Sequence, residues 1–166
     1  MRIFLITCIL LIMSGAAMAQ EKFSSDSFEA ITIRKAKELE LDTKTFQITN
    51  ITGPVDLTLI SKEEANNLDL KADVLEIRYA DDISKSPSFI YMEGNVDIFI
   101  QGRKILSDKA DIDLENGLAV FTGKIIVTLP DSEPITAKRM TLNMNTSKLT
   151  LTDMIIPRLS ITDPTP

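Results

Sequence analysis

The chain contains 166 residues, with 18 Lys and Arg against 24 Asp and Glu, which gives a formal net charge of -6. This acidic balance counts against a nucleic-acid-binding protein, which would normally carry a basic surplus. Because the sequence has no His and a single Cys, it also excludes Ser-His-Asp triads, Cys-His pairs and zinc fingers. The hydrophobic share of 44% is typical of a globular protein rather than a disordered one.

The N-terminus has the pattern of a secretory signal peptide. Arg2 precedes an apolar run from Ile3 to Met13, and Ala17 and Ala19 then form an A-x-A cleavage site before Gln20. A membrane-spanning helix needs about 20 apolar residues, so this run is too short for an anchor. We therefore expect cleavage between Ala19 and Gln20. Cleavage would remove the only cysteine, so the exported chain could not form disulfides.

From about Ile31 onward, apolar and polar residues alternate in short runs that predict β-strands. Met140, Leu142 and Met144, for example, alternate with Thr and Asn residues, and a period of two places them on one face of a strand. No stretch carries a helical apolar stripe over three turns, and the segment 61–68 is at most one or two helical turns or a loop. We therefore predict an all-β domain of repeated antiparallel strand pairs.

One sequence unit occurs four times along these strands. A small residue is followed by a charged one, and apolar residues stand three and five positions after the small residue; the starts are Ala36-Lys37, Ala72-Asp73, Ser107-Asp108 and Ala137-Lys138. The first three units run on to a glycine, with apolar residues two, four and six positions beyond it: Gly53, Gly94 and Gly123. The fourth unit has Asp153 in this place. Glycines at matching positions predict the same bend in each strand pair, which would fold a long sheet over on itself.

Three segments of these sequence units resemble the repeats of a known family. Ala72–Ile77, Met92–Val96 and Ser107–Leu114 are similar to the OstA-like domain of the LptA, LptC and LptD lipopolysaccharide-transport proteins. The resemblance covers roughly residues 30–156, and Gly94-Asn95-Val96 matches the family pattern best. The units at Gly53 and Gly123 depart from the pattern at the Asn after the glycine, and the last unit departs at the glycine itself.

The resemblance implies an open, slot-like β-jelly-roll whose two sheets face each other across an apolar interior. Family members carry lipopolysaccharide acyl chains there and join edge to edge into a bridge between inner and outer membranes. The implied partners are lipopolysaccharide, LptC-like and LptD-like proteins paired through sheet edges, and further copies of the chain. No catalytic residue, cofactor, metal or nucleic acid is implied. A cleaved signal peptide is typical of the periplasmic LptA-type subunit.

The expected organisation is a signal peptide at 1–19, a flexible N-terminus at 20–29, an OstA-like domain at 30–160 and a flexible tail at 161–166. The segments 31–41 and 149–159 are candidate sheet edges by position. The alternating apolar residues are expected to face inward as the lipid-binding slot: Leu39, Leu41, Leu75, Ile77, Tyr91, Val96, Ile98, Ile112, Leu114, Val127, Met140, Leu142 and Met144. The same residues also fit the closed core of a sandwich, because both require an alternating apolar face.

Two other functions stay open at this point. An LptC-like scaffold of the same pathway would keep its N-terminal apolar segment as a membrane anchor. A secreted hydrolase of the β-sandwich type would use a pair of carboxylates, although nothing in the sequence positions a particular pair. The acidic run that begins at Asp111 hints at a calcium loop, but Asn116 and Thr122 stand where an EF-hand requires Gly and Glu.

Overall fold

A computed structural model of the chain describes residue 23 and residues 25–155. The expected signal peptide and C-terminal tail lie outside these residues. The strands are β1 (Phe28–Lys35), β2 (Glu38–Leu41), β3 (Ile48–Ser61), β4 (Leu68–Tyr79), β5 (Pro87–Ile100), β6 (Arg103–Asp113), β7 (Leu118–Thr128), β8 (Ile135–Asn143) and β9 (Lys148–Thr152). Two short 3-10 turns, η1 (Ser25–Ser27) and η2 (Glu64–Asn66), are the only helical elements in the described part.

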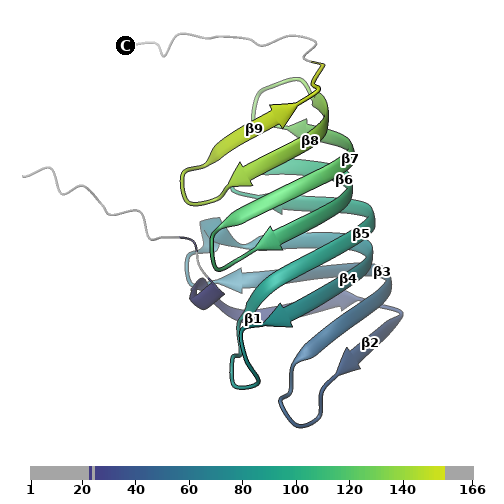
Figure 1. Cartoon of the computed structure of the whole chain (residues 1–166), viewed down its shortest axis with the longest axis vertical. Coiled ribbons are helices and arrows are strands. Elements are labelled where there is room, and N and C mark those ends of the chain that lie inside the picture. The colour runs from purple at the N-terminus through teal and green to yellow at the C-terminus, as the bar shows by residue number, and fades with distance from the viewer. Residues whose placement is uncertain (1–22, 24, 156–166) are drawn as a thin grey trace, which may run out of the picture.

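All strands belong to one antiparallel sheet in the order β1-β3-β4-β5-β6-β7-β8-β9, with β2 also paired to β3 (Figure 1). Consecutive strands from β3 onward are neighbours, so the sheet is a simple meander. The all-β prediction is therefore confirmed, and the segment 61–68 forms a single 3-10 turn at η2. The expected first strand, 31–41, is in fact two strands, since β1 and β2 both pair with β3 along different halves of its length.

The sheet bends sharply along one line, which divides it into two facing leaves. Each pairing from β3–β4 to β7–β8 slips by one residue there, and the extra residue lies on β3, β5 or β7, the strands that carry the glycines. The β1 leaf comprises residues 28–35, 55–61, 68–72, 96–100, 103–107, 125–128 and 135–137. The β2 leaf comprises residues 38–41, 48–52, 74–79, 87–93, 109–113, 118–122, 139–143 and 148–152. Figure 1 shows the β2 leaf in front and the β1 leaf, fainter, behind it.

The repeated sequence unit is the local cause of this bend. Ala72 and Leu75 are three residues apart, yet both are buried in the interior, because Asp73 and Val74 between them both face outward. In β4, the alternate positions that face inward are therefore even-numbered before the bend and odd-numbered after it. The inward positions shift by one residue at the bend in β6 and β8 as well. The three matching glycines have positive φ, which glycine adopts without steric cost, and Asp153 has a φ of +53° at the fourth position.

Charged side chains pack against the glycines of the bend. A Cβ added to Gly123 would collide with Asp108, and one added to Gly94 would collide with Asp73. Asp108 also accepts a hydrogen bond from the backbone N–H of Lys124 at 2.8 Å. Asp73 accepts one from the side-chain amide Nδ2 of Asn95 at 2.8 Å. The charged residue of the repeated unit thus packs directly against the glycine on the neighbouring strand, as Asp73 does on Gly94 and Asp108 on Gly123.

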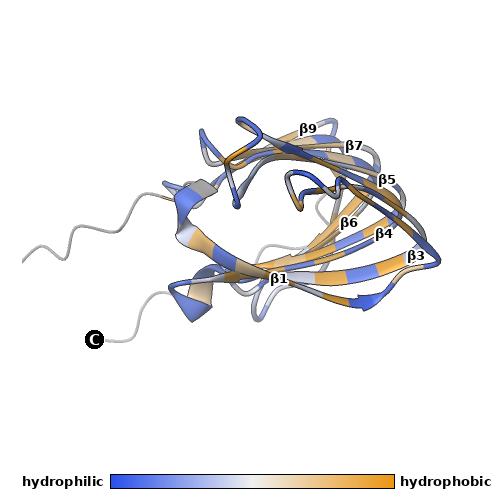
Figure 2. Ribbon diagram, turned by 90° about the horizontal axis from the view of Figure 1, so that it is seen from below, coloured by the Kyte–Doolittle hydropathy of each residue, from blue (hydrophilic) through white to orange (hydrophobic). Residues whose placement is uncertain are grey.

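The interior between the leaves is apolar and nearly fully buried. Figure 2 shows the sheet curving into an arch whose strands alternate between hydrophobic and hydrophilic residues. Phe23 is 2% exposed and packs edge-to-face on Phe28 with ring centroids 5.4 Å apart. The folded unit therefore includes Phe23, and β1 begins at Phe28, two residues before the boundary expected at residue 30.

Candidate functional site

The candidate site is the apolar interior between the leaves. Ten of the thirteen expected slot residues lie there and are buried: Leu75, Ile77, Val96, Ile98, Ile112, Leu114, Val127, Met140, Leu142 and Met144. They come from β4 to β8, and from the turns after β6 and β8, so every long strand after β3 contributes. Each such side chain stabilises the fold by about 1.5–3 kcal/mol through removal of apolar surface from water.

Tyr91 was expected to face inward, and the structure corrects this orientation. Ile90 and Met92 on either side of it are fully buried, so Tyr91 points to the outer face of the β2 leaf. Its hydroxyl donates a hydrogen bond to Glu93 Oε2 at 2.7 Å, and this contact with a carboxylate raises the pKa of Tyr91. The hydroxyl finds a polar partner outside that the apolar interior would not offer.

Leu39 and Leu41 lie on the inward side of the sheet but are not covered. Leu39 pairs with buried Ile51, which places both side chains on the interior face. Because β2 is a four-residue edge strand, the two leucines remain 39% and 45% exposed. They form an apolar rim at the edge of the β2 leaf.

Sequence reasoning missed several interior residues. Met92, Phe121 and Ile51 are fully buried, and each belongs to an alternating run whose opposite parity is also partly apolar. Phe23 stands alone in a polar segment, so no periodic pattern marks it as a core residue. Its burial is visible only in three dimensions.

Opposite the bend, the tips of the two leaves approach each other, and we call this side the mouth. Gln101, in the β5–β6 turn of the β1 leaf, donates from Nε2 to the carbonyl of Met144 in the β8–β9 turn at 3.3 Å. Ser147 Oγ donates to Gln101 Oε1 at 3.3 Å. A second link joins Ser86 Oγ to the carbonyl of Phe28 at 3.0 Å. These hydrogen bonds connect residues 43 to 58 positions apart in the chain.

The long edges of the sheet present backbone groups with no strand beside them. Among the described residues, β1 and β2 each pair only with β3, and β9 pairs only with β8. Beyond β9, Ile155 makes an isolated bridge to Thr136, which returns the chain to the β1 leaf. Both ends of the sheet are therefore open to pairing with another strand.

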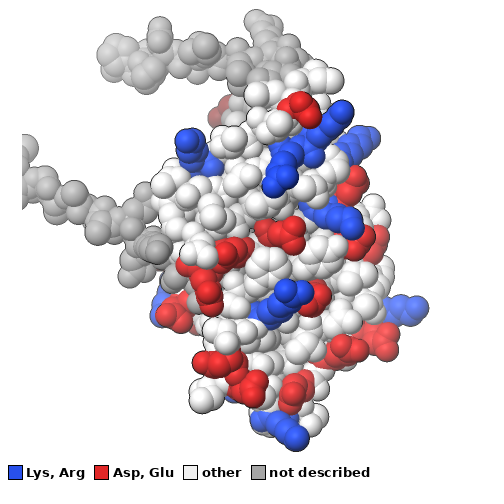
Figure 3. Space-filling view, in the orientation of Figure 1, with Lys and Arg blue, Asp and Glu red and all other residues white. Residues whose placement is uncertain are grey.

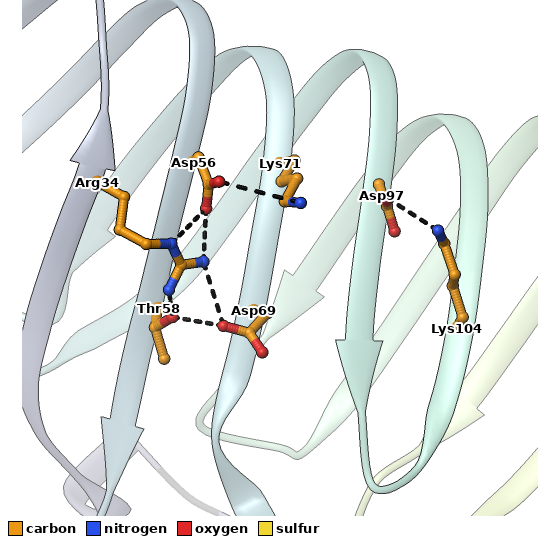
Figure 4. A network of polar contacts seen from close by, with 7 residues as sticks. All are labelled: Arg34, Asp56, Thr58, Asp69, Lys71, Asp97 and Lys104. Atoms are coloured by element: carbon orange, nitrogen blue, oxygen red, sulfur yellow. Dashed lines mark hydrogen bonds and ion pairs between the residues drawn. The ribbon is translucent and has the colours of Figure 1, made fainter.

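The outer face of the β1 leaf carries exposed ion pairs. Arg34 donates from Nε to Asp56 at 2.8 Å and also contacts Thr58 and Asp69 (Figure 4). The hydrogen bond to Asp56 raises the pKa of Arg34 above its ordinary value. Exposed pairs of this kind contribute about 0–1 kcal/mol each to stability. On the face turned to the viewer in Figure 3, acidic and basic side chains are interspersed.

Two further observations concern the described part of the chain. None of its helical segments has the length and apolar character of a membrane-spanning helix. It also contains no cluster of three or more acidic or Cys side chains placed to hold a metal ion.

The chain resembles a known transport protein in its fold. No family model matches the sequence, and no curated protein matches it. Among solved structures, it is similar to LptH from Pseudomonas aeruginosa, the LptA-homologous periplasmic component of a lipopolysaccharide transport device, with a TM-score of 0.60. The similarity covers 84% of this chain and 99% of LptH at 14% sequence identity. The chain therefore has an LptA-like β-jelly-roll fold.

Proposed function

We propose that this protein is a non-catalytic periplasmic carrier that binds the acyl chains of lipopolysaccharide between its two leaves. The observation that carries the proposal is an apolar interior that runs through the β-strands of an LptA-like fold whose sheet is not closed. Alkyl chains make no directional demand, so Leu, Ile, Val and Met suit them. Transfer of each methylene from water is favourable by about 0.8 kcal/mol.

An acyl chain can bind in the interior only if some of the side chains that occupy it move. In the structure the inward side chains fill it, and most of them are less than 5% exposed. An acyl chain therefore enters when the leaves separate at the mouth or when a movable side chain leaves. The bend is continuous along every long strand, so separation at the mouth breaks fewer contacts.

We also propose that the open edges join copies of this chain, or LptC-like and LptD-like partners, into a bridge between inner and outer membranes. The apolar rim of Leu39 and Leu41 on β2 and the unpaired side of β9 support this proposal. In this proposal the N-terminal segment is an export signal that is cleaved between Ala19 and Gln20, and the carrier acts in the periplasm. N-terminal sequencing of exported protein tests it, since an intact Met1 would instead favour the LptC-like anchored alternative.

Photo-crosslinking tests the lipid proposal directly. We expect benzoylphenylalanine at Leu142, which faces the interior, to crosslink to lipopolysaccharide in cells, whereas the same probe at outward Tyr91 does not. Equal labelling from the two positions, or none from Leu142 in a folded variant, would contradict the proposal. As a second arm, Ile77→Asp and Leu142→Asp are expected to abolish binding, with Tyr91→Asp as the outward control and circular dichroism to check strand content.

A further inference from the structure

A pocket of about 660 Å³ lies at the mouth, beside the hydrogen bonds of Gln101. Its walls come from η2, from the β5–β6 turn of the β1 leaf and from the β8–β9 turn of the β2 leaf. It is thus built by both leaves at the place where they meet. Small-molecule sites in proteins have volumes of about 300–1,000 Å³, so the pocket is large enough for a ligand group.

The rim of this pocket offers neutral hydrogen-bonding groups beside an aromatic ring. Asn66, Gln101 and Ser147 supply amide and hydroxyl groups, which both donate and accept hydrogen bonds. In the structure Gln101 joins the other two through hydrogen bonds of 3.3 Å, and a ligand would share or replace these long contacts. Phe99 lines the same pocket and is 48% exposed, so its ring is available for contact. Sugar hydroxyls, which also donate and accept, and the apolar faces of sugar rings match such a surface.

The floor of the pocket is apolar and leads into the interior. Phe23 and Met144 line it, and they are only 2% and 1% exposed. A ligand that fills both parts must therefore be polar at one end and apolar at the other. Phe23 precedes β1 and is not part of a strand, so its side chain can leave the interior without breaking strand pairing.

The charges around the pocket discriminate between polar ends. Among the described residues that line it, Glu63, Glu64 and Asp69 are acidic and Arg103 alone is basic. Asp69 is also paired with Arg34 outside the pocket, at 3.3 Å. Arg103 also donates to Gln101 Oε1 at 3.1 Å, which occupies part of its guanidinium. With Arg34 counted beside Asp69, the local charge is still net negative, which repels a phosphate and leaves an uncharged polyol unaffected.

We propose that the mouth pocket binds the saccharide part of an amphipathic lipid, while an alkyl chain of that lipid enters the interior in place of the Phe23 side chain. This inference rests on the lipid-carrying function proposed above. It adds the point of entry, the side chain that gives way and the chemistry of the polar end. Phosphate groups of the same lipid would then point to solvent.

Two ligands with the same alkyl chain test the proposal. Dodecyl maltoside and dodecyl phosphate are titrated below their micelle-forming concentrations into detergent-free protein at low salt, with calorimetry as the readout. We expect the maltoside to bind at least about tenfold more tightly, because the pocket repels the phosphate. Equal affinities would overturn the saccharide assignment and leave the carrier function standing. If neither ligand nor lipopolysaccharide binds, the carrier function itself is wrong.

A charge change locates the site. Glu64→Lys is expected to strengthen dodecyl phosphate binding by about three- to tenfold and to change maltoside binding less than twofold. Asp82→Lys makes the same charge change in the β4–β5 loop, away from the pocket, and serves as the matched control. If both variants act alike, the pocket is not where the polar end binds.

Removal of the displaced ring tests the alkyl part. Phe23→Ala is expected to strengthen binding of both ligands severalfold, since the chain no longer competes with the ring. Phe28→Ala, which removes the neighbouring buried ring outside the pocket but leaves the Phe23 ring in the place of the alkyl chain, is the control for general loosening of the core and should strengthen binding less than Phe23→Ala does. Unchanged or weaker binding by Phe23→Ala would show that Phe23 does not occupy the position of the alkyl chain.

Discussion

The bend and the mouth both connect the two leaves, and they do so by different means. At the bend, strands β3 to β8 pass from one leaf to the other, and glycines packed on charged side chains fix the geometry of their bulges. At the mouth, hydrogen bonds join a turn of one leaf to a turn or a strand end of the other, such as those of Gln101 and Ser86. Since the bend is built into the strands and the mouth is joined by few hydrogen bonds, we expect the carrier proposed above to keep the bend fixed and to open at the mouth.

The largest effect is expected from a change at the bend. Gly123→Ala adds a Cβ that collides with Asp108 at a φ of +95°, so we expect a loss of about 2–4 kcal/mol in the free energy of unfolding. Urea denaturation followed by circular dichroism measures it.

A second glycine provides the matched control for this change. Gly102, in the β5–β6 turn at the mouth, has a φ of +74°, but an added Cβ would meet only Pro130 Cγ at 3.7 Å. Gly102→Ala is therefore expected to cost only about 1–2 kcal/mol, from the backbone conformation alone. Equal losses in the two variants would show that the Asp108 contact does not fix the bend.

A smaller and more local effect is expected from the mouth. Gln101→Ala removes the hydrogen bonds that join the two turns, with a loss of about 0.5–1.5 kcal/mol. We expect hydrogen exchange to become faster in residues 101–103 and 144–147 and to stay unchanged in residues that flank the bend.

The control for Gln101 is another glutamine that bridges loops. Gln47 donates from Nε2 to the carbonyls of Asp81 and Ser84, which lie in the same leaf as itself. Gln47→Ala should cost a similar amount of stability without faster exchange in residues 101–103 and 144–147. If exchange at the mouth rises equally in both variants, Gln101 does not hold the leaves together.

The smallest effect is expected in the pH dependence of stability, from an ion pair on the outer side of the bend. Lys109 Nζ lies 2.8 Å from Glu93 Oε1, and its hydrogen bond, with that of Tyr91, lowers the pKa of Glu93 below its ordinary value of 4.5. Because the folded pKa is below the unfolded one, the stabilising contribution is present above pH 4.5 and is lost as the pH falls through the folded pKa.

Comparison of wild type with Glu93→Gln by urea denaturation checks this sign. The difference in stability should be present at pH 7, should vanish at low pH, and should shrink with added salt because the pair is exposed. A difference that grows as the pH falls would contradict the assignment.

The fold followed from local patterns to an unusual degree. The step of three residues from Ala72 to Leu75 marks the switch of parity, and the matching glycines mark the bulges opposite, so the repeated unit predicted the bend itself. The three-residue step depends on one strand, and each glycine contact depends on two neighbouring strands. Both features can therefore be recognised from residues that are close together in the sequence.

The orientation of Tyr91 could not be read in this way. From Phe89 to Met92 both parities of β5 are apolar, so the alternation does not decide which set is buried. Packing buries Ile90 and Met92, while Phe89 stacks under Arg78 at 5.6 Å and Tyr91 reaches Glu93. Leu39 and Leu41 lie on the interior face, and their exposure depends on the absence of a further strand beside β2 in the described chain.

The strands, their alternation and the line along which the sheet bends are encoded locally, because they depend on residues a few positions apart in the sequence. The contacts that hold the mouth and the side chains that fill the interior depend instead on how the folded sheet is arranged in space. Gln101 and Met144 are 43 positions apart, and Phe23 has no periodic partner. Contacts of this kind arise when the bent sheet brings distant turns together, and no local pattern encodes them.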